Sequence, residues 1–298
     1  MSLVSPQRFP IQSRVEDTIT IRPTSSALFG VDSADRYTSV EASAEGTSTP
    51  YKFTIVKNQA LFNGFFNRIA LTEIVFPYYI PNINLRTDMI IVNGNVITIA
   101  VPGFYNTTDL ADALEGAIIA SGVTPTLTVS YNSGRFVFNT NDASTLVFAR
   151  GNFAGPGAKI NQFQLFDLLN MGGVNTVASS LQVTGITKIK YTEYVDIVSS
   201  QLTYNQSLKD ASSDPIVRDV LARVYIDTGF GEVLGEPLTI YRQFSTPKQI
   251  KWDPTQPLGN VSFEVFDDKG ELLSSYLGPQ LPDSTMPDWR ITLLFSES

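Results

Sequence analysis

The feature that most constrains the fold is a repeated pattern of short runs in which apolar and polar residues alternate. In residues 51–57, YKFTIVK, Phe53 and Ile55 alternate with polar neighbours, as in a strand with one buried face. From Ile189 onward the same alternation returns in short runs separated by turn residues: IKYTEYVDIVSSQLTY, LTIYRQFS, KQIKW, NVSFEVFDDKGELL and WRITLLF. Short strands at this spacing are typical of a sandwich or barrel. The sequence therefore predicts a mainly β protein whose sheets combine two distant parts of the chain.

A second early strand is predicted over residues 68–76, RIALTEIVF, which are apolar on both faces, as in a strand covered on both sides. Residues 213–227 combine a helix start at Asp214-Pro215 with strand-like alternation, so we expect a turn or short helix leading into a strand. Two strands before the middle of the chain and about six after it total roughly eight, the number in a jelly roll. The predicted fold is a single jelly-roll β-sandwich formed by residues 49–85 plus 187–298.

Two prolines follow the second strand and enclose three large apolar residues. A proline removes a backbone donor and holds the preceding residue extended, so we expect the chain to leave the sheet ladder here. These side chains are expected to pack under an inserted unit or against a neighbouring chain; the alternative is an aromatic loop that covers the end of the sandwich. The candidate assembly or junction residues are Phe76, Pro77, Tyr78, Tyr79, Ile80 and Pro81.

Residues 86–186 have a different sequence pattern, with helix signals as well as strand signals, which predicts an inserted α+β domain. Asn93-Gly94 lies between apolar runs, which predicts a two-residue hairpin turn because both positions need a positive φ. Residues 106–122, NTTDLADALEGAIIASG, have the leucine spacing, the capping residues and the final glycine of a helix of about four turns. Another strand pair, a further strand and a short helix over 162–170 complete the unit.

Residues 1–48 are predicted to be an N-terminal arm. They have little apolar periodicity and lead into a polar run, SVEASAEGTSTP. Arg8, Phe9 and Arg14 are the candidate assembly residues of this arm, which we expect to become ordered against neighbouring subunits on the inner side. The alternative is a disordered tail without a binding role.

The absence of two residue types excludes several kinds of function. The chain has no Cys and no His, so a Ser or Cys triad with an imidazole base and a zinc site with imidazole or thiolate ligands cannot be built. A glycosidase needs only carboxylates, but Glu193 and Asp196 lie three apart in a predicted strand and should face opposite sides. Asp267-Asp268-Lys269-Gly270 is interpreted as a hairpin turn and not as a cation site. We therefore expect no enzyme, no cofactor and no metal.

Charge and hydropathy restrict the partners. The formal net charge is −8, and the 21 Lys and Arg are spread along the sequence, which argues against nucleic acid, and sequence-specific binding in particular, as the main partner. No apolar run approaches the roughly 18 residues that span a bilayer, and the N-terminus has no continuous apolar segment of the kind found in signal peptides. We expect a protein made in the cytoplasm, with no signal peptide and no membrane span.

Three segments resemble the penton, or minor capsid, proteins of virophages and related Polinton-like viruses. They are RIALTEIVFPYYIPNIN, YVDIVSSQLT and FSTPKQIKWDPTQPLGNVSFEVFDDKG, and the similarity covers about residues 51–84 and 189–295. The resemblance implies a single jelly roll at the five-fold vertex of an icosahedral virion, with the inserted domain projecting outward. It implies a homopentamer surrounded by hexagonal capsomers of a separate double jelly-roll major capsid protein. It supplies no catalytic residues.

A second hypothesis is a β-sandwich binding module that recognises a host glycan or surface receptor. The two hypotheses are compatible, because a protein at a capsid vertex is well placed to contact a host receptor.

Overall fold

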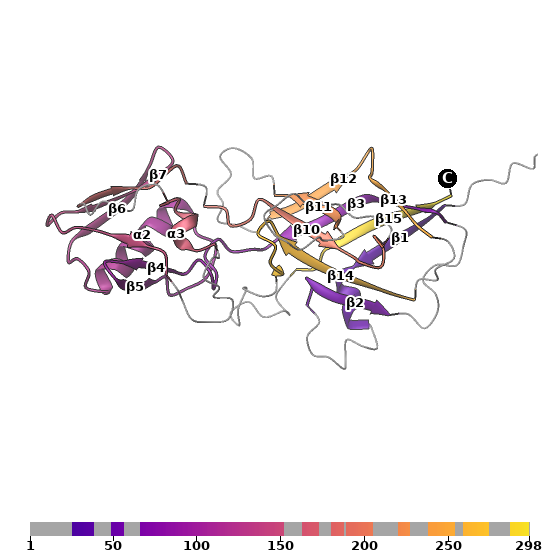
Figure 1. Cartoon of the computed structure of the whole chain (residues 1–298), viewed down its shortest axis with the longest axis horizontal. Coiled ribbons are helices and arrows are strands. Elements are labelled where there is room, and N and C mark those ends of the chain that lie inside the picture. The colour runs from indigo at the N-terminus through magenta and orange to yellow at the C-terminus, as the bar shows by residue number, and fades with distance from the viewer. Residues whose placement is uncertain are drawn as a thin grey trace, which may run out of the picture.

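The computed structural model describes residues 26–38, 49–56, 66–151, 163–172, 180–187, 189–204, 220–226, 238–253, 259–273 and 287–297. These residues form two units side by side, a β-sandwich that carries the C-terminus and a smaller α+β unit at the opposite end of the molecule (Figure 1). Among the described residues, no helix has both the length and the apolar character needed to cross a membrane.

The sandwich consists of two antiparallel sheets. Sheet A has the order β1 (Ser26–Asp32), β15 (Arg290–Ser296), β3 (Arg68–Tyr78) and β12 (Leu238–Gln243), with the short β13 (Gln249–Lys251) also paired to β3. Sheet B has the order β11 (Val220–Tyr225), β10 (Tyr194–Val198), β14 (Asn260–Asp267) and β2 (Lys52–Val56).

The strand connectivity is that of a jelly roll. Apart from β13, the chain order of the strands is β1, β2, β3, β10, β11, β12, β14 and β15. The first strand pairs with the last, the second with the seventh, the third with the sixth and the fourth with the fifth, always antiparallel. A long hairpin wound into two sheets produces this nested pairing, so the predicted single jelly-roll sandwich is confirmed.

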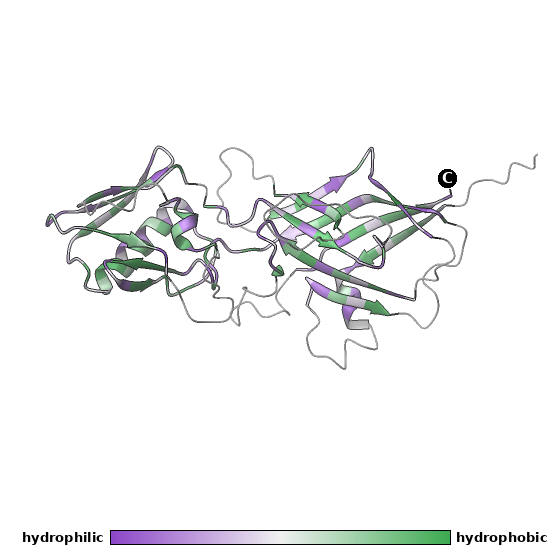
Figure 2. Cartoon of the chain, in the orientation of Figure 1, coloured by the Kyte–Doolittle hydropathy of each residue, from purple (hydrophilic) through white to green (hydrophobic). Residues whose placement is uncertain are grey.

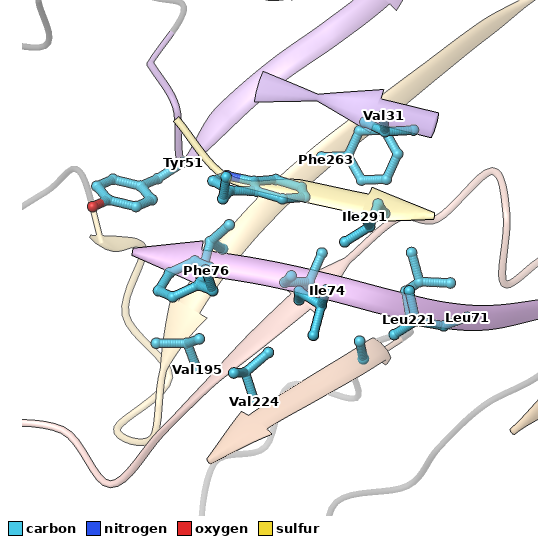
Figure 3. Close-up of a cluster of buried hydrophobic side chains, with 14 of the residues drawn as sticks. Val31, Tyr51, Leu71, Ile74, Phe76, Val195, Leu221, Val224, Phe263 and Ile291 are labelled. Carbon is cyan, nitrogen blue, oxygen red and sulfur yellow. The ribbon is translucent and has the colours of Figure 1, made fainter. Parts of the chain in front are cut away.

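The sandwich core lies between the inward faces of the two sheets and is rich in aromatic residues (Figure 3). Trp289, just before β15, lies with its ring 5.6 Å from Phe53 and 5.8 Å from Phe263, centroid to centroid. Its indole Nε1 donates a hydrogen bond of 2.5 Å to the Pro50 carbonyl, so the buried ring leaves no unpaired donor. Along β14, buried and more exposed residues alternate, and apolar and hydrophilic residues mix along its ribbon in Figure 2. Burial of one face of each strand therefore follows the alternation in the sequence.

The N-terminal arm prediction is wrong for residues 26–38, because these residues belong to the sandwich. Strand β1 pairs with β15 along its whole length, and η1 (Ser33–Thr38), a short 3-10 helix, follows it. Arg36 of η1 is buried and forms an ion pair with Asp288. The alternation in SALFGVD is weak because the outward side includes an exposed leucine and a glycine, which hides the strand from a periodicity argument. Three strands, and not two, therefore precede the inserted unit.

Strand β3 differs from the prediction in two ways. Thr292 of β15 lies opposite Glu73 and Leu293 lies opposite Leu71, so β3 contains an extra residue, Thr72, at a β-bulge. The bulge turns apolar residues on both sides of it toward the same core, which explains the apolar pattern without a second covered face. The strand also continues through Pro77, which lies opposite Thr239 of β12. The ladder to β15 ends at Val75, so proline is tolerated where β3 has a strand on one side only.

The inserted unit has a core of its own between two small sheets and two helices. One sheet has the order β5 (Asn95–Thr98), β4 (Met89–Val92) and β8 (Phe148–Ala149), and the other has β6 (Leu127–Asn132), β7 (Arg135–Thr140) and β9 (Leu181–Val183). The helices are α2 (Thr107–Ala120) and α3 (Leu165–Leu168).

Local signals located most of these elements correctly. Asn93 and Gly94 have φ of 50° and 80° in the β4–β5 turn, as predicted for the hairpin. Asn106 caps α2 by accepting a hydrogen bond of 2.8 Å from the Asp109 amide, and Gly122 follows the end of the helix. Turns and caps depend on neighbouring residues, so the sequence identifies them directly.

Candidate functional site at the junction of the two cores

The chain passes between the two cores at two places, which we call the neck: residues 81–88 on the way out and residues 189–193 on the way back. Ile80 belongs to the sandwich core and Ile83 to the inserted core. On the return, Ile189 lies in the inserted core and Tyr191 in the sandwich core. The side chains thus change core within two or three residues at each crossing. The predicted limits of an independent domain, 86–186, stay a prediction.

The outgoing side of the neck is held by hydrogen bonds to the inserted unit. The Asn82 side chain donates to the Tyr105 carbonyl at 2.7 Å and accepts from the Tyr105 amide at 2.9 Å. Next to it, the Ile83 and Gly103 backbones exchange two hydrogen bonds of 3.2 and 2.8 Å. The Thr87 hydroxyl donates to the Asn82 carbonyl at 2.7 Å. Because these groups are buried or partly buried and paired, the segment has little freedom to bend.

An ion pair joins the outgoing side of the neck to the sandwich. The Arg86 Nη2 lies 3.3 Å from the Glu271 Oε2, and the Arg86 side chain is 4% exposed. Glu271 follows the tight turn at the end of β14, where Gly270 has a φ of 86° and its amide donates to the Asp267 carbonyl. The predicted hairpin turn is therefore confirmed. A buried guanidinium needs its partner, so this pair resists separation of the two units.

A lysine from the same turn contacts the return side of the neck. Lys269 donates to the Tyr191 carbonyl and lies 2.7 Å from the Asp268 carboxylate. Its ammonium also lies 4.4 Å from the Tyr191 ring centre and 4.5 Å from that of Phe163. Phe163 packs against both cores. The cation is thus stabilised by a carboxylate and two aromatic faces at the contact between the units.

Burial raises the pKa of four ionisable groups in or beside the neck, and one of them is the Asp88 carboxyl. Desolvation raises the pKa of the Tyr78 and Tyr191 phenols, so both stay neutral at physiological pH. Desolvation also raises the pKa of the Asp267 carboxyl, against the lowering effect of the Glu271 backbone amide and of the charge on Lys269. These groups have structural roles in the contact between turn and neck, and their arrangement resembles no acid–base pair.

The junction residues singled out in the sequence fall into two groups. Phe76, Tyr78 and Ile80 belong to the sandwich core. Tyr79 packs at the edge of this core, and its ring meets Phe104 of the inserted unit edge-on at 5.4 Å. Pro77 lies in β3 and Pro81 is buried at the start of the neck. Arg8, Phe9 and Arg14 lie outside the described residues.

Sequence reasoning missed the charged contacts of the neck. Arg86 and Glu271 are far apart in the chain, and neither stands in a recognisable motif. The only available signal was the turn Asp267-Asp268-Lys269-Gly270, which predicts a hairpin but says nothing of what its side chains meet.

Comparison with known proteins adds one observation. The fold is similar to that of mavirus penton protein. A crystal structure of that protein, labelled with selenomethionine, superposes with a TM-score of 0.49 and 10% sequence identity, over 92% of this chain and 100% of that chain. The sequence matches no protein-family model and no curated protein.

Proposed function

We propose that this protein is a viral capsid structural protein, and that five copies form the vertex capsomer, the penton, of an icosahedral shell. The observation that carries the proposal is the jelly-roll connectivity combined with a second core held at one end of the sandwich. Jelly rolls recur in viral capsid proteins, lectins and cupins. A zinc enzyme with imidazole or thiolate ligands cannot be built from this sequence, which has no His and no Cys. A structural or binding role is therefore favoured.

The neck supports a role in which the inserted unit has a fixed direction. Two chain crossings, the Asn82 bonds to Tyr105 and the Arg86–Glu271 pair hold the unit against the end of the sandwich. In a closed ring each copy meets its neighbours through two different surfaces, head to tail. A unit fixed at one end of the sandwich would then project from the same side of the ring in every copy. We propose that this side faces outward and that the ring is enclosed by hexagonal capsomers of a double jelly-roll major capsid protein.

Charge makes the ring sensitive to salt. Five copies carry a formal charge of 5 × (−8), or −40, so the subunits repel one another at low ionic strength. Salt screens this repulsion over roughly 8 Å at physiological ionic strength. We expect the pentamer fraction to rise as salt is added and as mild acid lowers the negative charge.

Native mass spectrometry of the purified full chain over a range of concentrations tests the proposal. A species of five chains supports it, and sedimentation should show this species increasing with salt. A chain that stays monomeric at every concentration and ionic strength, also when mixed with the major capsid protein, would overturn it.

A receptor-binding function is the second candidate, and one exposed surface favours it. On the outer face of sheet B, Tyr225 is 57% exposed and its ring lies 5.8 Å from that of Tyr194. The Arg223 guanidinium lies 3.9 Å from the Tyr194 ring centre and pairs with Asp196 through bonds of 2.7 and 2.8 Å. An exposed aromatic beside an oriented guanidinium suits a sugar ring. A glycan array that compares the natural chain with Tyr225→Ala tests this, and equal signals from both exclude the surface.

A further inference from the structure

Most of the described basic side chains are neutralised by a carboxylate. Ion pairs hold Arg36, Lys52, Arg86, Arg150, Lys190, Arg223, Lys269 and Arg290. Among the described residues, Arg135 of the inserted unit and three cations of the sandwich have no carboxylate partner; we call the three of the sandwich, Arg68, Lys248 and Lys251, the distal cluster. Their grouping is unexpected in a chain with a net charge of −8.

The sheet register brings the distal cluster together from distant parts of the sequence. Lys251 of β13 lies directly opposite Arg68 at the start of β3. The Arg68 Nη1 donates to the neutral Gln249 side chain at 3.0 Å, and Lys248 immediately precedes β13. All three cations are exposed. Opposed residues in neighbouring strands lie about 5 Å apart, so the charges of Arg68 and Lys251 share one small area at the edge of sheet A, and Lys248 lies three residues along the chain from Lys251.

The distal cluster and the inserted unit lie at opposite ends of the sandwich. Strand β3 begins at Arg68 and ends at Tyr78, beside the neck. Its 11 residues cover about 36 Å. In Figure 1 the strand β13 lies near the C-terminus, away from the inserted unit. One end of the molecule therefore has a second core, and the other has three described cations without a carboxylate partner.

Within the described part of the chain, the acidic groups near the distal cluster form no ion pair with it. Asp253 and Glu297 follow β13 and β15, but both are partly buried and have interactions of their own. Glu73 lies five residues along β3 from Arg68, about 16 Å away. Lys248 is exposed, but loss of some contact with water lowers the pKa of its ammonium by disfavouring the charged form. An anion at this place would restore favourable interactions to all three cations.

We propose that the distal cluster binds the phosphate backbone of nucleic acid without regard to sequence. Lys and Arg on flexible stems, spread over a strand edge, recognise phosphate charge and not the shape or edge of a base. The biological meaning rests on the proposed capsid function: if the inserted unit points outward, the distal cluster faces the packaged genome. Five copies in a ring would present 5 × 3 such cations, so weak contacts would act together.

The test measures binding of the full-length chain to a fluorescent double-stranded DNA by anisotropy, from about 50 to 200 mM salt. The substituted chain is Arg68→Gln/Lys248→Gln/Lys251→Gln. Removing three phosphate contacts should lower the slope of log affinity against log salt by about 2.7, which is roughly 0.9 for each contact. We expect the same loss for a DNA of unrelated sequence. Lys248→Arg/Lys251→Arg should keep both affinity and slope.

A matched control comes from the inserted unit. Arg135 is exposed and has no carboxylate partner among the described residues; it donates to the Thr184 carbonyl at 3.1 Å. Arg135→Gln changes the net charge without touching the distal cluster, so DNA binding should change little. If Arg135→Gln lowers binding as much, per charge, as the triple substitution does, general charge and not the distal cluster is responsible, and the proposal fails.

Three other outcomes would overturn the proposal. One is natural protein that does not bind DNA at about 50 mM salt. Another is a triple variant that aggregates while still binding DNA, because lysines at a sheet edge also prevent edge-to-edge association. The third is binding to vesicles of anionic lipid but not to DNA. Native mass spectrometry of the same samples tests the capsid proposal independently. Pentamers that do not bind DNA would contradict the DNA-binding proposal and leave the capsid proposal intact.

Discussion

The sandwich core is built from strands at opposite ends of the chain, whereas the inserted core is built mainly from sequence neighbours. Ser26 of β1 lies opposite Ser296 of β15, while the β4–β5 and β6–β7 pairs are hairpins with two-residue turns. Closing a long loop costs more entropy than closing a short one. We therefore expect the inserted core to form faster and to unfold in a transition of its own. The sandwich core therefore depends on contacts between distant segments of the chain, whereas the inserted core depends mainly on contacts between nearby segments.

The largest effect is expected from Trp289→Ala in the sandwich core. Trp289 is fully buried against Phe53 and Phe263. The substitution should lower the free energy of unfolding of the sandwich by about 3–5 kcal/mol, because it leaves a large cavity. Hydrogen exchange resolved by residue should show faster exchange in β14 and unchanged protection in α2. Equal loss in both would mean that the cores unfold as one unit.

The reciprocal change is Leu114→Ala on the buried face of α2. Leu114 is fully buried in the inserted core, and we expect a loss of about 2–5 kcal/mol confined to that unit. Protection should fall in β6 and stay constant in β14. Together the two substitutions also test the predicted limits of the inserted domain, 86–186. A matched surface control is Ile119→Ala, which lies on the same helix but is partly exposed and should cost far less.

A smaller effect is expected from Glu271→Gln, which removes the ion pair between the two units. It leaves the buried Arg86 guanidinium without its carboxylate, at a cost of about 1–3 kcal/mol. The unfolding transitions of the two units should move apart, because a contact that couples them is weakened. A double-mutant cycle with Arg86→Met measures the interaction energy directly. Additive effects would contradict a role for this pair in the neck.

The smallest effect is expected from Asp267→Asn and depends on pH. Burial raises the pKa of the Asp267 carboxyl in the folded state, so the folded protein binds its proton more tightly than the unfolded chain does. This group therefore makes stability fall as pH rises from the ordinary aspartate range through the raised pKa. Asn can still accept the hydrogen bonds from the Lys269 and Glu271 amides, at 2.9 and 2.8 Å. Asp267→Asn should flatten the pH dependence of the unfolding midpoint in this window, and an unchanged profile would contradict the assignment.

Local patterns in the sequence predicted many of the individual elements. The hairpin at Asn93-Gly94, the helix α2 and the turn at Gly270 follow from residues that are neighbours in the chain. The count of about eight sandwich strands was also correct, although β1 was assigned to the arm. Its weak alternation carried too little signal, and only pairing with β15 reveals it as a strand.

Other features were misinterpreted because a periodic pattern has more than one physical cause. Apolar residues on both faces of β3 suggested a strand covered twice, but the bulge at Thr72 directs them to one core. Pro77 suggested the end of a strand, but the neighbouring ladder stops at Val75 and the proline costs little there. The sequence shows each residue but not its neighbours across the sheet. At both Thr72 and Pro77 these neighbours decide the strand geometry.

The alternation of apolar and polar residues, the turn residues and the lack of Cys and His were enough to determine a mainly β fold and to exclude imidazole and thiolate chemistry. Only the tertiary structure decided which strands pair, how the neck is held and that Arg68 meets Lys251. Local conformation depends on a few adjacent residues, and so the sequence displays it directly. Contacts between distant segments depend on the path of the whole chain, which no short stretch of sequence contains.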